Sequence, residues 1–387
     1  MAHAMPFVMR FLVAWLVLAA GPAAASNALT DPEIERVVTI ERVVTEEIGK
    51  ALNAAEAGAA VSVRVDGRTL YFNFGWADRS RGRPVTSDSL FNLGSLSKLF
   101  DVTLLSLAVQ RGDIAFDDPV AKHIHELRRG RDIRAVTLDQ LMTFTSGFSV
   151  VADNPPWWPA VPYDLPKFLR HLRDWRIDKD FARGRQYLYS HAGFMLLHVA
   201  LERRFDMPYV DLLRQQLLQR LDLPSTTLPL RGGNDVGIFP PSLKARLVQG
   251  YSPKGKPLGK PGNVQGYYYW PGTSQMFSSA RDLAAFLALH LGEGPQDPQL
   301  REAVALTHRE IAEIRPGVMQ ARAFEVHRPG VLIVDKNGGL NNTTTYFGMI
   351  PKARLGLVIL INRGDLNGRD IGHAILLRLA PAESSGL

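Results

Sequence analysis

Residues 59–74 read AAVSVRVDGRTLYFNF, and this stretch predicts the β-hairpin around which the fold is built. The valines of 61–65 alternate with polar residues, and the apolar residues of 70–74 do the same, as expected for strands with one buried face. Asp66-Gly67 separates the two runs, and glycine readily adopts the positive φ that a two-residue hairpin turn requires. The N-terminal part of the chain therefore contributes two antiparallel strands.

Three further β-rich runs lie near the C-terminus, at 331–336, 344–350 and 355–362. The connections within each terminal group are too short for the crossover that parallel neighbours need, so each group should be antiparallel. One helix is expected over much of 31–56 and another over 369–379. These elements predict a sheet of about five core strands, built from both ends of the chain and flanked by helices.

The middle of the chain, from about 96 to 260, has a largely helical pattern interrupted by loops rich in Pro, Gly and Trp. The simplest architecture is a mixed α/β fold in which a mostly helical region is inserted into the sheet. We expect residues 26–110 and 270–387 to form the sheet part and residues 111–269 to form the inserted part. The active site is then expected in the cleft between them.

Composition excludes several classes of function. The 387 residues include 45 Lys and Arg against 38 Asp and Glu, and this net charge of +7 is spread along the chain. No basic stripe interleaved with aromatic residues occurs, so a nucleic-acid partner is not expected. Cysteine is absent, which leaves neither a disulfide framework nor a cysteine nucleophile.

The N-terminus has the layout of a secretory signal peptide. Arg10 precedes the apolar run FLVAWLVLAAG, and the small residues Ala23, Ala24 and Ala25 follow it, which predicts a signal peptide over 1–25. A membrane anchor is the alternative, but the apolar run is short for a span. We expect an exported, periplasmic protein that is monomeric and has no stable membrane span after cleavage.

The stretch LGSLSKLF at 93–100 places Lys98 three residues after Ser95, at the start of an apolar helix. Positions i and i+3 share a helix face, so the amine would lie one turn from the hydroxyl. A desolvated lysine near a helix N-terminus can lose its proton and accept one from serine. Because Ser-x-x-Lys is common by chance, an ordinary solvated lysine is an open alternative at this point.

Two other stretches could contribute polar groups to a cleft. In YLYSHAGFMLL (187–197), Tyr189 and His191 precede an apolar helix, where packing and helix capping are the simpler roles. In VDKNGGLNN (334–342), Lys336 at a strand end is followed by two glycines. Such a strand edge can receive a ligand backbone, although a glycine turn between two strands is the preferred interpretation of this stretch taken alone.

Taken together and in this order, the three stretches resemble the serine β-lactamase and penicillin-binding-protein superfamily. The similarity is greatest to class C β-lactamases and to their D-alanyl-D-alanine peptidase and esterase relatives. It extends over about 35–380 and includes YFGMIPKARLGLVILIN near the C-terminus. The resemblance implies a β-lactamase/transpeptidase-like fold and a reaction that needs no cofactor.

The resemblance also implies roles for individual residues. Ser95 matches the acylated nucleophile and Lys98 its proton-handling partner. Tyr189 matches the tyrosine of the Tyr-x-Asn motif, which shuttles protons. Lys336 matches the lysine of Lys-Thr-Gly, which polarises the site and attracts a substrate carboxylate. The backbone N–H groups of Ser95 and Gly339 match the oxyanion hole.

Two residues depart from the family pattern. His191 stands where asparagine is usual, and Asn337 replaces the threonine of Lys-Thr-Gly. Both belong to the substrate-binding set that the resemblance implies, together with Gly338 and Asn367. These departures bear on the choice of substrate more than on the catalytic chemistry.

The expected activity is hydrolysis of a β-lactam amide through an acyl-enzyme, as in a class C β-lactamase. A D-alanyl-D-alanine carboxypeptidase or endopeptidase acting on D-Ala-D-Ala peptides, or an esterase, is an alternative on the same scaffold. A non-hydrolytic protein that binds β-lactams or muropeptides is a second alternative, motivated by His191 and Asn337.

Other candidate features receive simpler interpretations. His123, His125 and Glu126 have a metal-like spacing, but we interpret them as solvated surface and expect no metal site. The aromatic runs Trp157-Trp158 and Tyr267–Trp270 could line a cleft or pack in loops.

Overall fold

The structure is a computed structural model that describes residues 30–148, 165–231, 237–262, 275–295, 297–328 and 330–381. The predicted signal peptide and the aromatic runs at 157–158 and 267–270 lie outside these residues. Among the described residues, no helix is both long enough and apolar enough to cross a membrane.

The predicted hairpin is present and connects the two ends of the chain. Strands β1 (Gly58–Val65) and β2 (Arg68–Asp78) pair around the turn at Asp66 and Gly67, both of which have positive φ. On its other side β1 pairs with β13 (Leu355–Ile361), with Ala59 opposite Ile361. The mixed α/β fold with an antiparallel sheet from both chain ends is therefore confirmed.

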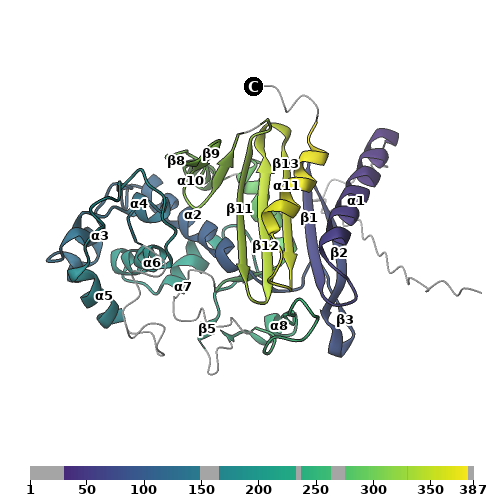
Figure 1. Ribbon diagram of the computed structural model, residues 1–387, viewed down its shortest axis with the longest axis horizontal. Coiled ribbons are helices and arrows are strands. Elements are labelled where there is room, and N and C mark those ends of the chain that lie inside the picture. Colours follow the sequence, from purple (N-terminus) through teal and green to yellow (C-terminus); the bar gives the residue numbers. More distant parts are fainter. Residues whose placement is uncertain are drawn as a thin grey trace, which may run out of the picture.

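The main sheet has nine strands in the described part of the chain, and all neighbours are antiparallel (Figure 1). In spatial order they are β3 (Arg83–Pro84), β2, β1, β13, β12 (Thr343–Ile350), β11 (Ile333–Leu340), β10 (Glu325–His327), β9 (Val318–Gln320) and β8 (Ala312–Arg315). The prediction of about five strands was too low. The four additional strands span only two to four residues each, which is too short for a periodic pattern to stand out.

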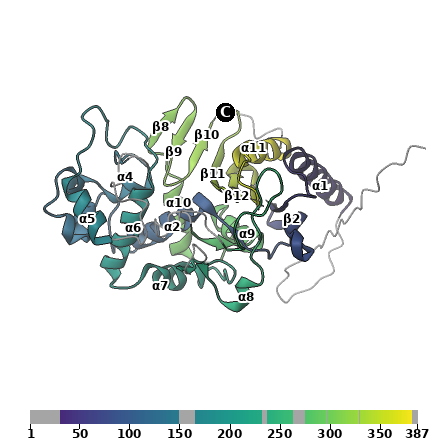
Figure 2. The same cartoon turned by 60° about the horizontal axis from the view of Figure 1, so that its bottom comes forward.

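Both faces of the central strand β13 are buried, which explains why it reads as a continuous apolar run. One face packs against α1 (Asp31–Ala51) and α11 (Gly368–Leu379), and Leu357 and Ile359 belong to this core. The other face packs against α2 (Ser97–Gln110), α9 (Ala280–His290) and α10 (Pro298–Thr307), and Val358 and Leu360 belong to that core. Figure 2 shows the sheet between these two groups of helices.

The region between α2 and α9 is mainly helical in its described parts, as predicted. Its helices are α3 (Val120–His123), α4 (Leu138–Met142), α5 (Leu165–Asp174), α6 (His191–Phe205), α7 (Tyr209–Leu213) and α8 (Pro241–Lys244). Short strands also occur there, since β5 (Leu230–Arg231) pairs with β6 (Gly237–Ile238). The short strand β7 (Phe277–Ser278) pairs with β4 (Phe91–Asn92), which precedes α2. The division of the chain at 110 and 269 stays a prediction.

Candidate active site

Ser95 lies in a single 3₁₀ turn, Gly94–Leu96, immediately before α2. Lys98 follows on α2 and is fully buried, with its Nζ 3.5 Å from Ser95 Oγ. Burial lowers the pKa of Lys98 to about 7, although the nearby Asp101 carboxylate opposes the shift. A lysine with this pKa exists in both protonation states near neutral pH, so it can accept a proton from Ser95 and return it.

Tyr189 brings a hydroxyl group to the same serine. Its hydroxyl lies 2.6 Å from Ser95 Oγ, and its ring stacks on Phe144 with the centroids 4.6 Å apart. Lys98 Nζ lies 5.2 Å from the Tyr189 ring centroid, and Lys336 Nζ lies 5.3 Å from it. Two amines therefore flank the tyrosine that contacts the candidate nucleophile.

Lys336 is in the middle of β11, not at a strand end as the sequence suggested. Burial lowers the pKa of Lys336, and Lys98 and Arg369 lower it further, whereas Tyr189 and Glu325 oppose the shift. The two glycines that follow continue the strand and pair with β12. On the opposite edge, β10 pairs with β11 only as far as Asp335, so β11 has no partner strand there beyond Asp335 among the described residues.

Gly338 and Gly94 allow β11 to pack closely on the segment that carries Ser95. A Cβ on Gly338 would lie 2.6 Å from the Leu93 carbonyl oxygen and 2.5 Å from Thr345 Oγ1. A Cβ on Gly94, which has a φ of +52°, would lie 2.8 Å from the Gly339 nitrogen. The Gly339 backbone amide and the Ser95 turn are thus neighbours, as an oxyanion hole built from both would require.

His191 is the first residue of α6 and is buried beside the same tyrosine. Its ring meets the Tyr189 ring edge-on, with the centroids 5.3 Å apart. Burial lowers the pKa of His191 to about 2, with additional contributions from Lys98 and Lys336. The imidazole is therefore neutral at physiological pH and offers one donor and one acceptor to a ligand.

Asn367 and Asn337, the other two predicted substrate contacts with side chains, lie in different settings. Asn367 is the N-cap of α11, where its side-chain oxygen accepts hydrogen bonds from the Arg369 and Asp370 amides. Asn337 is partly exposed and follows Lys336 in β11, so the alternation of a strand directs the two side chains to opposite faces. Substrate contact by either asparagine stays a prediction.

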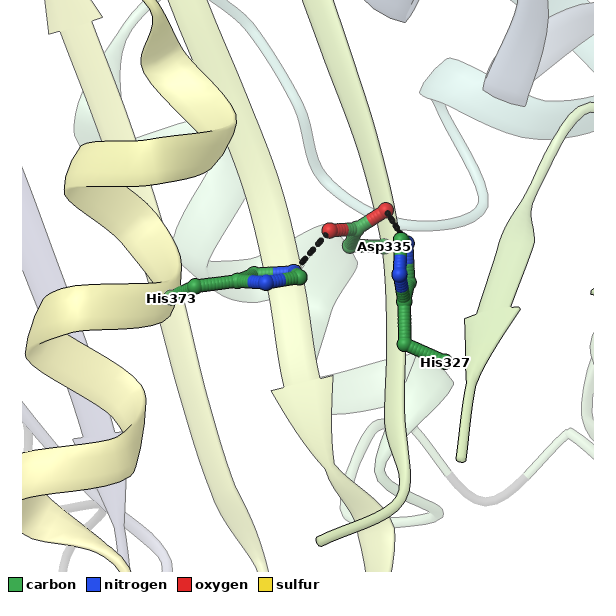
Figure 3. Close-up of side chains that lie close together, drawn as sticks. All are labelled: His327, Asp335 and His373. Atoms are coloured by element: carbon green, nitrogen blue, oxygen red, sulfur yellow. Dashed lines mark hydrogen bonds and ion pairs between the residues drawn. The ribbon is translucent and has the colours of Figure 1, made fainter. Parts of the chain in front are cut away.

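Sequence reasoning missed a buried polar cluster on the far side of β11. His327 on β10, Asp335 on β11 and His373 on α11 lie close together (Figure 3). In the sequence these residues are 8 and 38 positions apart, so no local motif indicated them. Among the described residues, these three form the group of His and acidic side chains that is compact enough to hold a metal ion.

The metal-like spacing at 123–126 has a different explanation. His123 Nε2 is 2.9 Å from Asp118, and His125 is paired with its neighbour Glu126.

Comparisons with known proteins agree with this fold. The family model described as Beta-lactamase matches residues 41–382. A β-lactamase of Pseudomonas fluorescens is 26% identical over 354 residues, which cover 83% of this chain and 93% of that protein. A β-lactamase of Lysobacter lactamgenus is 27% identical over 353 residues, which cover 82% of this chain and 86% of that protein.

Solved structures show the same fold. A β-lactamase/D-alanine carboxypeptidase from Pseudomonas syringae superposes with a TM-score of 0.75 at 22% identity, covering 90% of this chain and all of that one. A class C β-lactamase from Rhodobacter sphaeroides superposes with a TM-score of 0.71 at 26% identity, covering 88% of this chain and 98% of that one. Because the family model spans most of the sequence, the chain belongs to the beta-lactamase family of serine hydrolases.

Proposed function

We propose that this protein is an exported, class C-like β-lactamase that opens the β-lactam amide through an acyl-enzyme on Ser95. The observation that carries the proposal is the position of Ser95 Oγ, 2.6 Å from the Tyr189 hydroxyl and 3.5 Å from Lys98 Nζ. A serine hydroxyl is a weak nucleophile until a neighbouring base removes its proton. Here two groups that can take that proton converge on it from different elements.

In the acylation step, Ser95 Oγ attacks the lactam carbonyl as its proton moves to the Tyr189 hydroxyl, which passes its own proton on to a neutral Lys98. Because burial lowers the pKa of Lys98 to about 7, a neutral amine is available as a base near neutral pH without further activation. The N–H groups of Ser95 and Gly339 hold the oxyanion, and each such donor is worth roughly 3 kcal/mol in the transition state. The C–N bond then breaks, and the lactam nitrogen receives the proton.

In the deacylation step, water attacks the Ser95 ester and the acid product leaves as Ser95 regains its proton. Tyr189 accepts the proton of the attacking water as its own hydroxyl proton moves to Ser95 Oγ, 2.6 Å away. The charge of a protonated Lys336 beside the Tyr189 ring stabilises the negative charge that develops on the tyrosine oxygen. Lys336 also attracts the carboxylate that β-lactams and D-Ala-D-Ala peptides both carry.

A D-alanyl-D-alanine carboxypeptidase is the second candidate function. The observation that favours it is the fold shared with the β-lactamase/D-alanine carboxypeptidase described above. The replacement of the usual asparagine and threonine by His191 and Asn337 bears on which acyl group the pocket accepts. The neutral His191 ring fills space next to Tyr189. The two functions share the acylation step and differ in which acyl group the pocket accepts and in how fast water releases it.

The test is mass spectrometry of the intact protein after exposure to benzylpenicillin, combined with nitrocefin turnover. We expect a penicilloyl adduct on Ser95, catalytic turnover of nitrocefin, and neither in Ser95→Ala. Ser97→Ala is the matched control, because Ser97 is buried two residues away and only accepts a hydrogen bond from the Met276 amide among the described contacts.

The outcomes separate the candidate functions. A stable adduct without turnover, together with release of D-alanine from a D-Ala-D-Ala peptide, would replace the β-lactamase assignment by the carboxypeptidase. An adduct without either reaction would indicate a β-lactam-binding protein. Absence of both an adduct and a product would contradict acyl transfer on these substrates.

A further inference from the structure

Asp335 immediately precedes Lys336 in β11, and the two side chains point to opposite faces of the sheet. Lys336 lies over the rings of Phe144 and Tyr189, whereas Asp335 is fully buried on the face covered by α11. Figure 3 shows His327 and His373 directed at the Asp335 carboxylate from β10 and from α11. One strand thus carries an active-site lysine and, next to it, a buried carboxylate.

The Asp335 carboxylate is held by three side chains. His373 Nε2 is 2.6 Å from Oδ2 and His327 Nε2 is 3.2 Å from Oδ1. The Arg369 guanidinium donates from Nε and Nη2 at 3.1–3.2 Å. Burial alone would raise the pKa of Asp335, but the hydrogen bonds from the two histidines and the charge of Arg369 hold it far below its usual range.

This donor set resembles a metal site, but Arg369 already supplies the positive charge. The ligand atoms of His327, Asp335 and His373 lie within 4.8 Å of one another, as a zinc site would need. However, the guanidinium contacts both Asp335 oxygens and also pairs with Glu325 at 2.9 Å. A divalent cation would have to displace Arg369 or lie against it, so the cluster is better explained as a metal-free ion-pair network.

We propose that Asp335 and His373 are positioning residues for Lys336, because their hydrogen bond ties β11 to α11 and so fixes where Lys336 stands beside Tyr189. The proposal rests on the proposed function, which gives Lys336 its role. The tie to α11 matters because β11 loses one of its two neighbouring strands at this point: β10 stops pairing with β11 at Asp335. From Lys336 onwards, β12 is the one strand that pairs with β11 among the described residues.

The electrostatics of the site point the same way. Burial is the main reason that the pKa of Lys336 is lowered, but Glu325 and Arg369 also act on it with opposite signs. Both residues belong to the network around Asp335. The network therefore influences the charge of Lys336 as well as its position.

The test compares three histidine variants. His373→Ala removes one donor to Asp335 from a side chain that is 23% exposed, so the fold should tolerate it. His373→Gln keeps an N–H group near the position of Nε2. His123→Ala is the matched control, because His123 also contacts an aspartate, at 2.9 Å, but on α3.

We expect His373→Ala to slow acylation of Ser95 by fluorescent penicillin at least about fivefold, and His373→Gln to restore the rate to within about twofold. His123→Ala should lower the melting temperature without slowing acylation. Equal acylation rates in His373→Ala and the parent would overturn the proposal, because the cluster would then only stabilise the fold. Recovery of the parent's rate on adding ZnCl2 after EDTA treatment, absent in His373→Ala, would overturn the metal-free interpretation and the proposal with it.

A crystal structure of His373→Ala gives a readout that does not depend on the substrate. We expect Lys336 Nζ to move by about 1 Å or more from its place beside the Tyr189 ring, and to return in His373→Gln. An unmoved Lys336 would contradict positioning even if the parent protein is not acylated. Failure of the parent to react with penicillin, by contrast, would count against the proposed function alone.

Discussion

Ser95 Oγ is closer to the Tyr189 hydroxyl, at 2.6 Å, than to Lys98 Nζ, at 3.5 Å. The two contacts come from different parts of the chain, because Tyr189 precedes α6 whereas Lys98 is on α2. The nearer group makes the stronger hydrogen bond, so the proposed mechanism makes the tyrosine the first acceptor of the serine proton. Lys98 then acts through Tyr189 as well as on Ser95 directly.

Replacing Tyr189 by phenylalanine should therefore slow acylation while leaving the packing intact. Because a positioned general base contributes roughly 10²- to 10⁴-fold, we expect kcat/KM for nitrocefin to fall within this range in Tyr189→Phe. The measurement is steady-state turnover together with the rate of adduct formation.

Tyr187→Phe is the matched control for this change. Tyr187 is two residues away, packs edge-on against Phe144, and has a pKa raised chiefly by burial. It should keep kcat/KM close to that of the parent. Equal losses in the two variants would mean that packing of the loop, and not the Tyr189 hydroxyl, supports the reaction.

Burying the Lys98 amine should lower the free energy of unfolding, even though the same amine supports catalysis. Its pKa is about 7 in the folded protein, below the ordinary value of 10.5. Below pH 7 the folded protein carries the full penalty of a buried charge. Between about pH 7 and 10.5 unfolding takes up a proton at Lys98, so the free energy of unfolding rises with pH by up to about 1.4 kcal/mol per pH unit.

Lys98→Met should consequently be more stable than the parent, with its advantage largest at pH 6 and shrinking towards pH 9. Urea unfolding of both proteins at pH 6, 7.5 and 9 measures this difference. Lys50→Met, which changes an exposed lysine on α1, should show no such trend. An advantage that stays constant with pH would contradict a neutral Lys98 in the folded protein.

Much of the fold could be predicted because its signals are local. The turn at Asp66 and Gly67 and the apolar run of β13 each lie within a few residues, and so do the positions of Ser95 and Lys98. The resemblance then supplied the order in which Ser95, Tyr189 and Lys336 appear, and the structure brings these three residues together.

The parts that could not be predicted depend on tertiary packing. Strands β8, β9 and β10 are too short to show alternation, and the sheet supplies the partners that make them strands. Lys336 lies in mid-strand because Gly338 and Gly339 continue to pair with β12. The network around Asp335 joins three elements that only the completed sheet brings together.

His191 should influence substrate choice but not the pH dependence of the reaction. Its pKa of about 2 keeps the ring neutral throughout the assay range, whereas the pKa of Lys98 lies near 7. We expect kcat/KM to fall below about pH 7 as Lys98 becomes protonated, with the same midpoint in the parent and in His191→Asn. The pH–rate profiles of both proteins from pH 5 to 9 measure this, and loss of the acid limb in His191→Asn would assign the titration to the histidine instead.

The two adjacent glycines of β11 provide the sharpest structural contrast in the site. A methyl group on Gly338 would meet the Leu93 carbonyl at 2.6 Å, whereas one on Gly339 finds its nearest neighbour, the Thr343 carbonyl oxygen, at 3.6 Å. Gly338→Ala must push β11 away from the turn that carries Ser95, and overpacking of this kind costs about 1–3 kcal/mol. Gly339→Ala keeps the backbone N–H that the oxyanion hole needs and has room for its methyl group.

We expect Gly338→Ala to lower both the melting temperature and kcat/KM for nitrocefin, while Gly339→Ala changes neither by much. A fully active Gly338→Ala would show that the close approach of β11 to Ser95 is not required for acylation.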